Sequence, residues 1–191
     1  MPYSPLLERA LRTAATAHAG QTRKGGAIPY VTHLTGTAII LARAGFSDEE
    51  LLAAAILHDT LEDTTLTAEE LESDFGHRVA SLVRDASEVK HDRQGKKLPW
   101  KTRKAEHISR LASCPVESRA IVLADKLHNL GTLLDDLKSD SDVWTRFNAP
   151  PADILEYYEA MFRLADNEPT LQAFTASGRE LLVALRQHLS Y

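Results

Sequence analysis

The chain has 191 residues, 43% of them hydrophobic and 26% charged, which is the composition of a soluble globular protein large enough for one domain. The net charge is only −5 and no apolar run is long enough to cross a bilayer, so we expect neither a nucleic-acid partner nor a membrane partner. Cys114 is the single cysteine, and the first residues lack the features of a signal peptide; both observations favour a cytoplasmic location.

Helix signals follow one another along almost the whole chain. Two capping boxes, Ser47 with Glu50 and Thr67 with Glu70, are typical of helix starts. In chain order, helices are predicted over about 5–18, 31–44, 47–63, 67–76, 77–87, from 99 onward, over 115–138, and in two stretches after 151 that separate near 167–168. Alternation of β-branched residues is absent, so we expect an all-α fold, a compact single-domain helical bundle over 1–191.

A group of ionisable residues ends the apolar run 51–57. His58 and Asp59 follow that run directly, and Glu62 and Asp63 come one turn later. Buried charge is costly unless it is paired or bound to a cation. On one continuous helix, His58 would stack with Glu62 and Asp59 with Asp63. An imidazole beside a carboxylate suits manganese, iron, cobalt or zinc, so the group predicts a divalent-metal hydrolase site.

Two other apolar helices each carry a polar residue of the same kind. His33 lies in the second predicted helix, and a lone histidine there is more often a core residue than a metal ligand. Asp125, Asn129 and Thr132 form a stripe at i, i+4 and i+7 with His128 beside it. Such a stripe indicates either a hydrogen-bonded core network or the wall of a pocket. Only the combination with the His-Asp pair favours a metal site.

Cationic residues gather in two places. Arg23 and Lys24 precede two glycines, which favours a phosphate or base contact, although a solvated turn explains the same pattern. Segment 90–110 holds eight lysines or arginines against two acidic residues, so it carries +6 while the rest of the chain carries −11. An acidic protein with one basic segment fits a local anionic ligand, and a solvated basic surface is the plainer alternative.

Together, these ordered motifs resemble the HD-domain phosphohydrolases, in particular the hydrolase domain of the RelA/SpoT homologue family and its stand-alone form, the small alarmone hydrolases. The most specific block, 55–64, reads Ala-Ile-Leu-His-Asp-Thr-Leu-Glu-Asp-Thr. The matching blocks cover 18–25, 29–33, 55–64, 75–83 and 123–130. They lie within about 5–135, and we expect 136–191 to pack on that core as C-terminal helices. No synthetase region follows, which favours a hydrolase alone.

The resemblance implies a site and a reaction. It implies one Mn2+ ion with four ligands, His33, His58, Asp59 and Asp125. It implies catalytic roles for Glu62 and Asp63. It implies substrate contacts from Arg23 and Lys24 at the guanine end and from Asn129 and Thr132 along the nucleoside. On electrostatic grounds, the second diphosphate would contact Lys97, Lys101 and Arg103. The implied reaction removes pyrophosphate from the 3′ position of ppGpp or pppGpp, leaving GDP or GTP.

Several positions depart from the family pattern. Segment 85–90 reads Asp-Ala-Ser-Glu-Val-Lys where the family has a Val-Thr-Lys-like stretch, and Gly131 replaces a common arginine. These departures do not affect the expected metal ligands, but they leave the preferred nucleotide substrate undetermined. One alternative is an HD hydrolase for another nucleotide, such as a deoxynucleotide, a nucleoside monophosphate or NADPH. Another is a catalytically silent module that binds alarmone. The sequence is also compatible with a homodimer.

Overall fold

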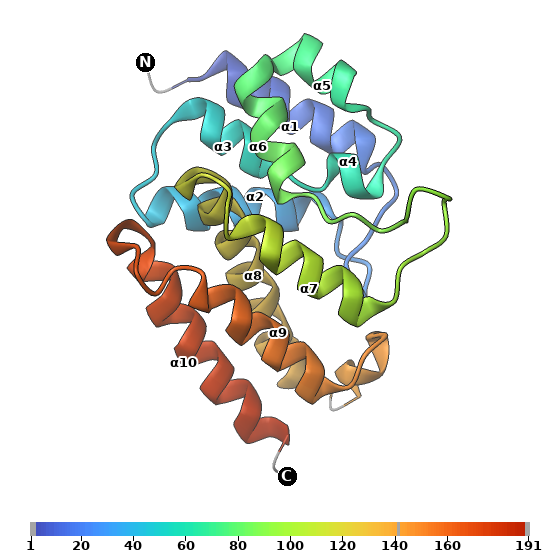
Figure 1. The fold of residues 1–191 in the computed structure, drawn as a ribbon, viewed down its shortest axis with the longest axis vertical. Helices are drawn as coiled ribbons and strands as arrows, with labels where there is room; N and C mark the ends of the chain where they lie inside the picture. The colour runs from blue at the N-terminus through green and yellow to red at the C-terminus, as the bar shows by residue number, and fades with distance from the viewer. Residues whose placement is uncertain (1–2, 141, 190–191) are drawn as a thin grey trace.

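The computed structural model describes residues 3–140 and 142–189, and within these ranges it is helical, with two isolated β-bridges and no strand (Figure 1). The α-helices are α1 (Pro5–Ala17), α2 (Val31–Arg43), α3 (Glu49–Leu57), α4 (Thr60–Asp63), α5 (Ala68–Phe75), α6 (His77–Ala86), α7 (Trp100–Leu111), α8 (Val116–Leu137), α9 (Pro151–Arg163) and α10 (Gln172–Leu189). Two 3-10 turns are η1 (Val143–Arg146) and η2 (Pro169–Leu171). The prediction of an all-α bundle is confirmed.

Local capping accounts for where several helices begin. Thr67 and Glu70 form the predicted capping box at the start of α5. The predicted box at Ser47 is wrong, because Asp48 is the N-cap of α3 and accepts the Leu51 N–H at 2.9 Å. Aspartate caps a helix as well as serine does, and two glutamates in the first turn add favourable interactions with the helix dipole.

The core forms around α3 and α8. Helix α3 contacts α1, α2 and α6, and α8 contacts α2, α6 and α10. Both helices are buried along most of their length, with Leu57 and Leu123 at most 1% exposed. In the described part of the chain, no helix is long and apolar enough to span a membrane. The meeting of α2, α3 and α8 places their polar residues next to one another inside the bundle.

The predicted continuous helix through 58–63 is wrong. Helix α3 ends at Leu57 and α4 begins at Thr60, with His58 and Asp59 between them. The Thr60 hydroxyl donates to the Leu57 carbonyl at 2.6 Å, so a side chain takes part in the hydrogen bonding at the end of α3. His58 therefore does not stack on Glu62, and α4 turns the two later carboxylates to one side.

Candidate metal centre and active-site cleft

Three helical elements bring the predicted metal ligands together. His33 on α2, His58 after α3 and Asp125 on α8 are all buried, and one ligand atom from each lies within 4.8 Å of the others. Asp125 Oδ1 lies 3.2 Å from His33 Nε2 and 4.0 Å from His58 Nε2. Asp59 Oδ2 lies 3.1 Å from His58 Nε2 and 3.5 Å from His33 Nε2. The four side chains thus converge, with Asp59 beside the three-residue group.

The two histidines present their Nε2 atoms to this centre because their Nδ1 atoms have other partners. His58 Nδ1 lies 2.8 Å from the Ala55 carbonyl, and His33 Nδ1 lies 3.0 Å from His128 Nδ1. His58 Nε2 is buried and makes no hydrogen bond within 3–140 and 142–189. A buried nitrogen lone pair facing carboxylate oxygens fits a divalent metal ion, which takes neutral imidazole and carboxylate ligands.

A second layer of side chains orients the carboxylates. The Tyr30 hydroxyl donates to Asp59 Oδ2 at 2.7 Å. The Asn129 amide donates to Asp125 Oδ1 at 2.5 Å, and the Lys126 ammonium pairs with Asp125 Oδ2. Such outer contacts fix the direction in which a ligand presents its lone pairs.

The charges of the centre stabilise one another. Burial raises the pKa of Asp59, but electrostatic and hydrogen-bond interactions with His58 and His33 outweigh it and hold that pKa well below its usual value. Burial also raises the pKa of Asp125. The opposing effects of Lys126 and the two histidines are larger, so the pKa lies below its usual value. Both carboxylates are therefore ionised at neutral pH, as cation ligands must be.

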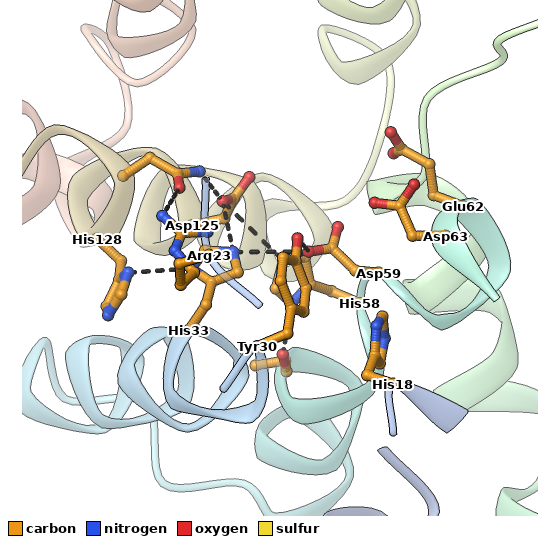
Figure 2. Close-up of polar contacts among 12 residues, drawn as sticks. His18, Arg23, Tyr30, His33, His58, Asp59, Glu62, Asp63, Asp125 and His128 are labelled. Atoms are coloured by element: carbon orange, nitrogen blue, oxygen red, sulfur yellow. Dashed lines mark hydrogen bonds and ion pairs between the residues drawn. The ribbon is translucent and has the colours of Figure 1, made fainter. Parts of the chain in front are cut away.

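The predicted catalytic pair lies beside the metal centre. Figure 2 shows Glu62 and Asp63 on one side of Asp59, while His128 lies on the other side next to His33. Burial raises the pKa of Glu62, and the Asp59 charge adds to this, whereas Lys90 and the Glu88 N–H oppose it. A carboxylate with a raised pKa close to a cation site suits general base chemistry.

A cleft of about 940 Å³ opens above the centre. It is lined by the loop before α2, by α4, α7, α8 and α9, and by the segments around them. Of the predicted substrate contacts, six line it: Arg23, Lys24, Lys97, Arg103, Asn129 and Thr132. Arg23 Nη2 donates to Asn129 Oδ1 at 2.7 Å and to Thr132 Oγ1 at 3.4 Å. The predicted stripe on α8 is thus a pocket wall that fixes the Arg23 guanidinium.

The predicted basic group divides. Lys101 is not among the residues that line the cleft, because its side chain is 76% exposed and pairs with Asp153 at 2.9 Å. Arg103 lines the cleft but pairs with the buried carboxylate of Glu88. Lys97 lines the cleft as expected. The number of charges along the sequence does not tell which basic side chains point into the cleft and which form ion pairs elsewhere.

Sequence reasoning missed five contributors, which are Tyr30, Lys90, Lys104, Lys126 and the metal-centre contact of His128. Tyr30 and Lys126 lie inside the matching blocks 29–33 and 123–130, which is a signal that could have found them. Positive charge was the only sequence feature of Lys90 and Lys104 that could have indicated a role at the site. Tyr157 and Tyr158 on α9 also line the cleft.

Comparisons with known proteins agree with this geometry. A family model described as HD domain matches residues 10–154. A zebrafish protein (Danio rerio) named guanosine-3′,5′-bis(diphosphate) 3′-pyrophosphohydrolase MESH1 is 39% identical over 122 residues, 63% of this chain and 64% of that protein. The protein of the same name from Xenopus tropicalis is 38% identical over 130 residues, 67% of this chain and 69% of that one. The match therefore spans about two thirds of these relatives.

Solved structures extend the likeness to nearly the whole chain. A metazoan orthologue of SpoT, described as hydrolysing ppGpp, superposes with a TM-score of 0.75 at 31% identity, covering 97% of this chain and 96% of that one. The lmo0812 protein of Listeria monocytogenes superposes with a TM-score of 0.68 at 31% identity, covering 78% of this chain and 96% of that one. The chain therefore belongs to the HD domain family, as a RelA/SpoT homologue.

Proposed function

We propose that the protein hydrolyses the 3′-pyrophosphate of guanosine alarmones, converting ppGpp or pppGpp to GDP or GTP and pyrophosphate, with Mn2+ as its metal. The observation that carries this proposal is the convergence of His33, His58, Asp59 and Asp125 next to the carboxylates of α4, inside one cleft. The names of relatives at 38% identity or more support the choice of substrate.

The cleft provides separate contacts for the parts of such a nucleotide. The Arg23 guanidinium, fixed by Asn129 and Thr132, would contact the guanine, and Lys24 lies beside it. Lys97 lines the cleft and would attract phosphate oxygens, whereas Lys104 lines it but already pairs with Glu88. The positive charge of Arg103 is offset by Glu88, so it would contribute less than its predicted share. Lys101 would act from outside the cleft, through long-range attraction alone.

The chain's own groups would carry the proton transfers. His33, His58, Asp59 and Asp125 would hold the ion, which when bound supplies positive charge for phosphoryl oxygens and lowers the pKa of water. Glu62 or Asp63 would orient a water and accept its proton as it attacks the phosphorus joined to the 3′ oxygen. The bond between that phosphorus and the 3′ oxygen breaks, the oxygen gains a proton, and pyrophosphate leaves.

A product assay with a nucleotide panel tests the function. We expect the protein with Mn2+ to release pyrophosphate and GDP from ppGpp, measured by ion-exchange chromatography. Release of phosphate only from deoxynucleotides, nucleoside monophosphates or NADPH would instead identify another HD hydrolase. Binding of ppGpp without any product over hours would identify a silent alarmone-binding module.

Substitution of a predicted ligand tests the metal centre. Asp59→Ala should abolish metal binding and turnover together, because Asp59 contacts both histidines of the centre. Isothermal titration with Mn2+ and the product assay on the same sample measure the two effects. A variant that keeps its turnover after losing Mn2+ binding would refute the assignment.

A further inference from the structure

The segment between α6 and α7 contacts the two carboxylates of α4. Lys90 Nζ lies 3.2 Å from Glu62 Oε1 and 2.5 Å from Asp63 Oδ1. The same ammonium donates to the backbone carbonyl of Glu62 at 3.3 Å. One half-buried cation thus contacts three oxygens of a single helical turn, and charge-assisted bonds of this kind are the strongest that a side chain makes.

The second carboxylate oxygen of Glu62 is held by backbone. The Glu88 N–H donates to Glu62 Oε2 at 3.0 Å. The two oxygens of the Glu62 carboxylate therefore bind to residues two positions apart, the Lys90 ammonium and the Glu88 backbone amide. Rotation of the Glu62 carboxylate about its last side-chain bond would break both contacts.

Glu88 is in turn fixed to α7. Its side chain is 4% exposed, and its carboxylate pairs with Arg103 and Lys104. A buried carboxylate that lost both cations would be strongly destabilising, so these pairs hold the segment in place. The segment therefore connects α4 to α7, and both helices line the cleft.

Helix α4 cannot fix its side chains by itself. It has four residues, and the amides of Glu62 and Asp63 both bond to the Asp59 carbonyl. A single helical turn is unstable without outside contacts. Gln21 supplies one of these contacts, since its amide donates to the Asp63 carbonyl at 2.9 Å. Lys90 and the Glu88 N–H supply further contacts, on the side of the two carboxylates.

We propose that Lys90 is a positioning residue that holds Glu62 and Asp63 in the arrangement needed for catalysis. This inference rests on the proposed function, in which those two carboxylates act on the water. Lys90 ends the stretch 85–90, where this chain departs from the Val-Thr-Lys-like pattern of the family.

Lys90 also lines the cleft, so a direct contact with a substrate phosphate is the competing role. The two roles differ in steady-state kinetics. A lost substrate contact raises KM and leaves kcat unchanged, whereas misplaced catalytic groups lower kcat and leave KM unchanged. They also differ in the free protein, because only the positioning role stabilises α4 before substrate binds.

The test compares Lys90→Met with Lys90→Arg and with the control Lys138→Met, whose exposed ammonium pairs with Asp135 outside the carboxylate pair. For Mn2+-dependent ppGpp hydrolysis, Lys90→Met should lower kcat roughly 10- to 100-fold with KM unchanged. Lys90→Arg should recover most of that loss, because a guanidinium fork can contact both carboxylates. Lys138→Met should match the wild-type protein, and Mn2+ affinity should be equal in all of them.

Hydrogen exchange provides a readout that needs no turnover. Peptides covering 59–67 should exchange faster in Lys90→Met than in the wild-type protein and at the wild-type rate in Lys90→Arg. Circular dichroism verifies folding, and Lys90→Gln repeats the comparison if the methionine variant does not fold. Unchanged kcat and exchange, or a raised KM with unchanged kcat, would overturn the inference. If the wild-type protein left ppGpp intact, the proposed function would fail, and the exchange comparison would still decide the role of Lys90.

Discussion

At the scale of single residues, the metal centre depends on which nitrogen each histidine offers. His58 Nδ1 donates to the Ala55 carbonyl. His33 Nδ1 is within hydrogen-bond distance of His128 Nδ1. Burial, to which the positive charge of Arg23 adds, lowers the pKa of His128 to about 4, so its imidazole is neutral at pH 7. A neutral His128 can accept the Nδ1 proton of His33, which leaves the His33 Nε2 lone pair free for a cation.

His128→Ala should therefore weaken Mn2+ binding roughly 10- to 100-fold, because His33 loses the partner that sets its tautomer and its orientation. Isothermal titration on the purified variant measures the affinity. The matched control is His77→Ala, which removes an exposed histidine from α6 that pairs with Glu72. Equal affinities in the His128 variant and the wild-type protein would show that His33 needs no such partner.

At the scale of elements, the four candidate ligands could be recognised from the sequence, and the contacts that surround them could not. His33, His58, Asp59 and Asp125 stood out because each interrupts an apolar helix, and burial makes such residues informative. Helix propensity does not reveal the break between α3 and α4, where the Thr60 hydroxyl bonds to the Leu57 carbonyl. The contacts of Lys90 join residues 27 and 28 positions apart, and no local pattern encodes them.

The packing of α9 against α10 sets a limit on substitution. A Cβ atom at Gly178 would lie 2.6 Å from three ring carbons of the buried Phe162. Gly178→Ala should lower the free energy of unfolding by about 1–3 kcal/mol, because the overpacking exceeds the gain in helix propensity. The control Gly131→Ala, with open space around its Cβ, should raise stability by up to about 1 kcal/mol. Urea denaturation measures both, and equal stabilisation of the two variants would refute the close contact.

At the scale of the whole molecule, the C-terminal helices complete the cleft. Helix α9 contributes Ile154, Tyr157 and Tyr158 to its lining, and α10 packs on both α8 and α9 (Figure 1). The assignment of residues 136–191 to the same domain, as helices that pack on its core, stays a prediction. The extent of one domain over 1–191, the homodimer and the cytoplasmic location stay predictions, because they concern assembly and cellular context.

Global stability should depend on pH through His107. Its side chain is 4% exposed, its ring nitrogens have no hydrogen-bond partner in the described residues, and burial followed by the charges of Lys126 and Arg110 lowers its pKa to about 3. An unfolded histidine titrates near pH 6.5, so the unfolded chain binds a proton that the folded one excludes. Stability is therefore full above about pH 6.5 and decreases as the pH falls toward 3.

His107→Leu should make the loss of stability between pH 7 and pH 5 smaller than in the wild-type protein. Urea denaturation at the two pH values measures the difference, and His188→Leu at an exposed position of α10 is the control. A His107 variant with the same pH dependence as the wild-type protein would show that this imidazole takes up a proton in the folded state.

Four side chains from three parts of the bundle should bind one divalent ion. Crystals grown with Mn2+ and measured near the manganese absorption edge test this most directly. We expect one strong anomalous peak within coordination distance of His33, His58, Asp59 and Asp125. Density that shows the four side chains bonded only to one another, with manganese elsewhere or nowhere, would contradict it.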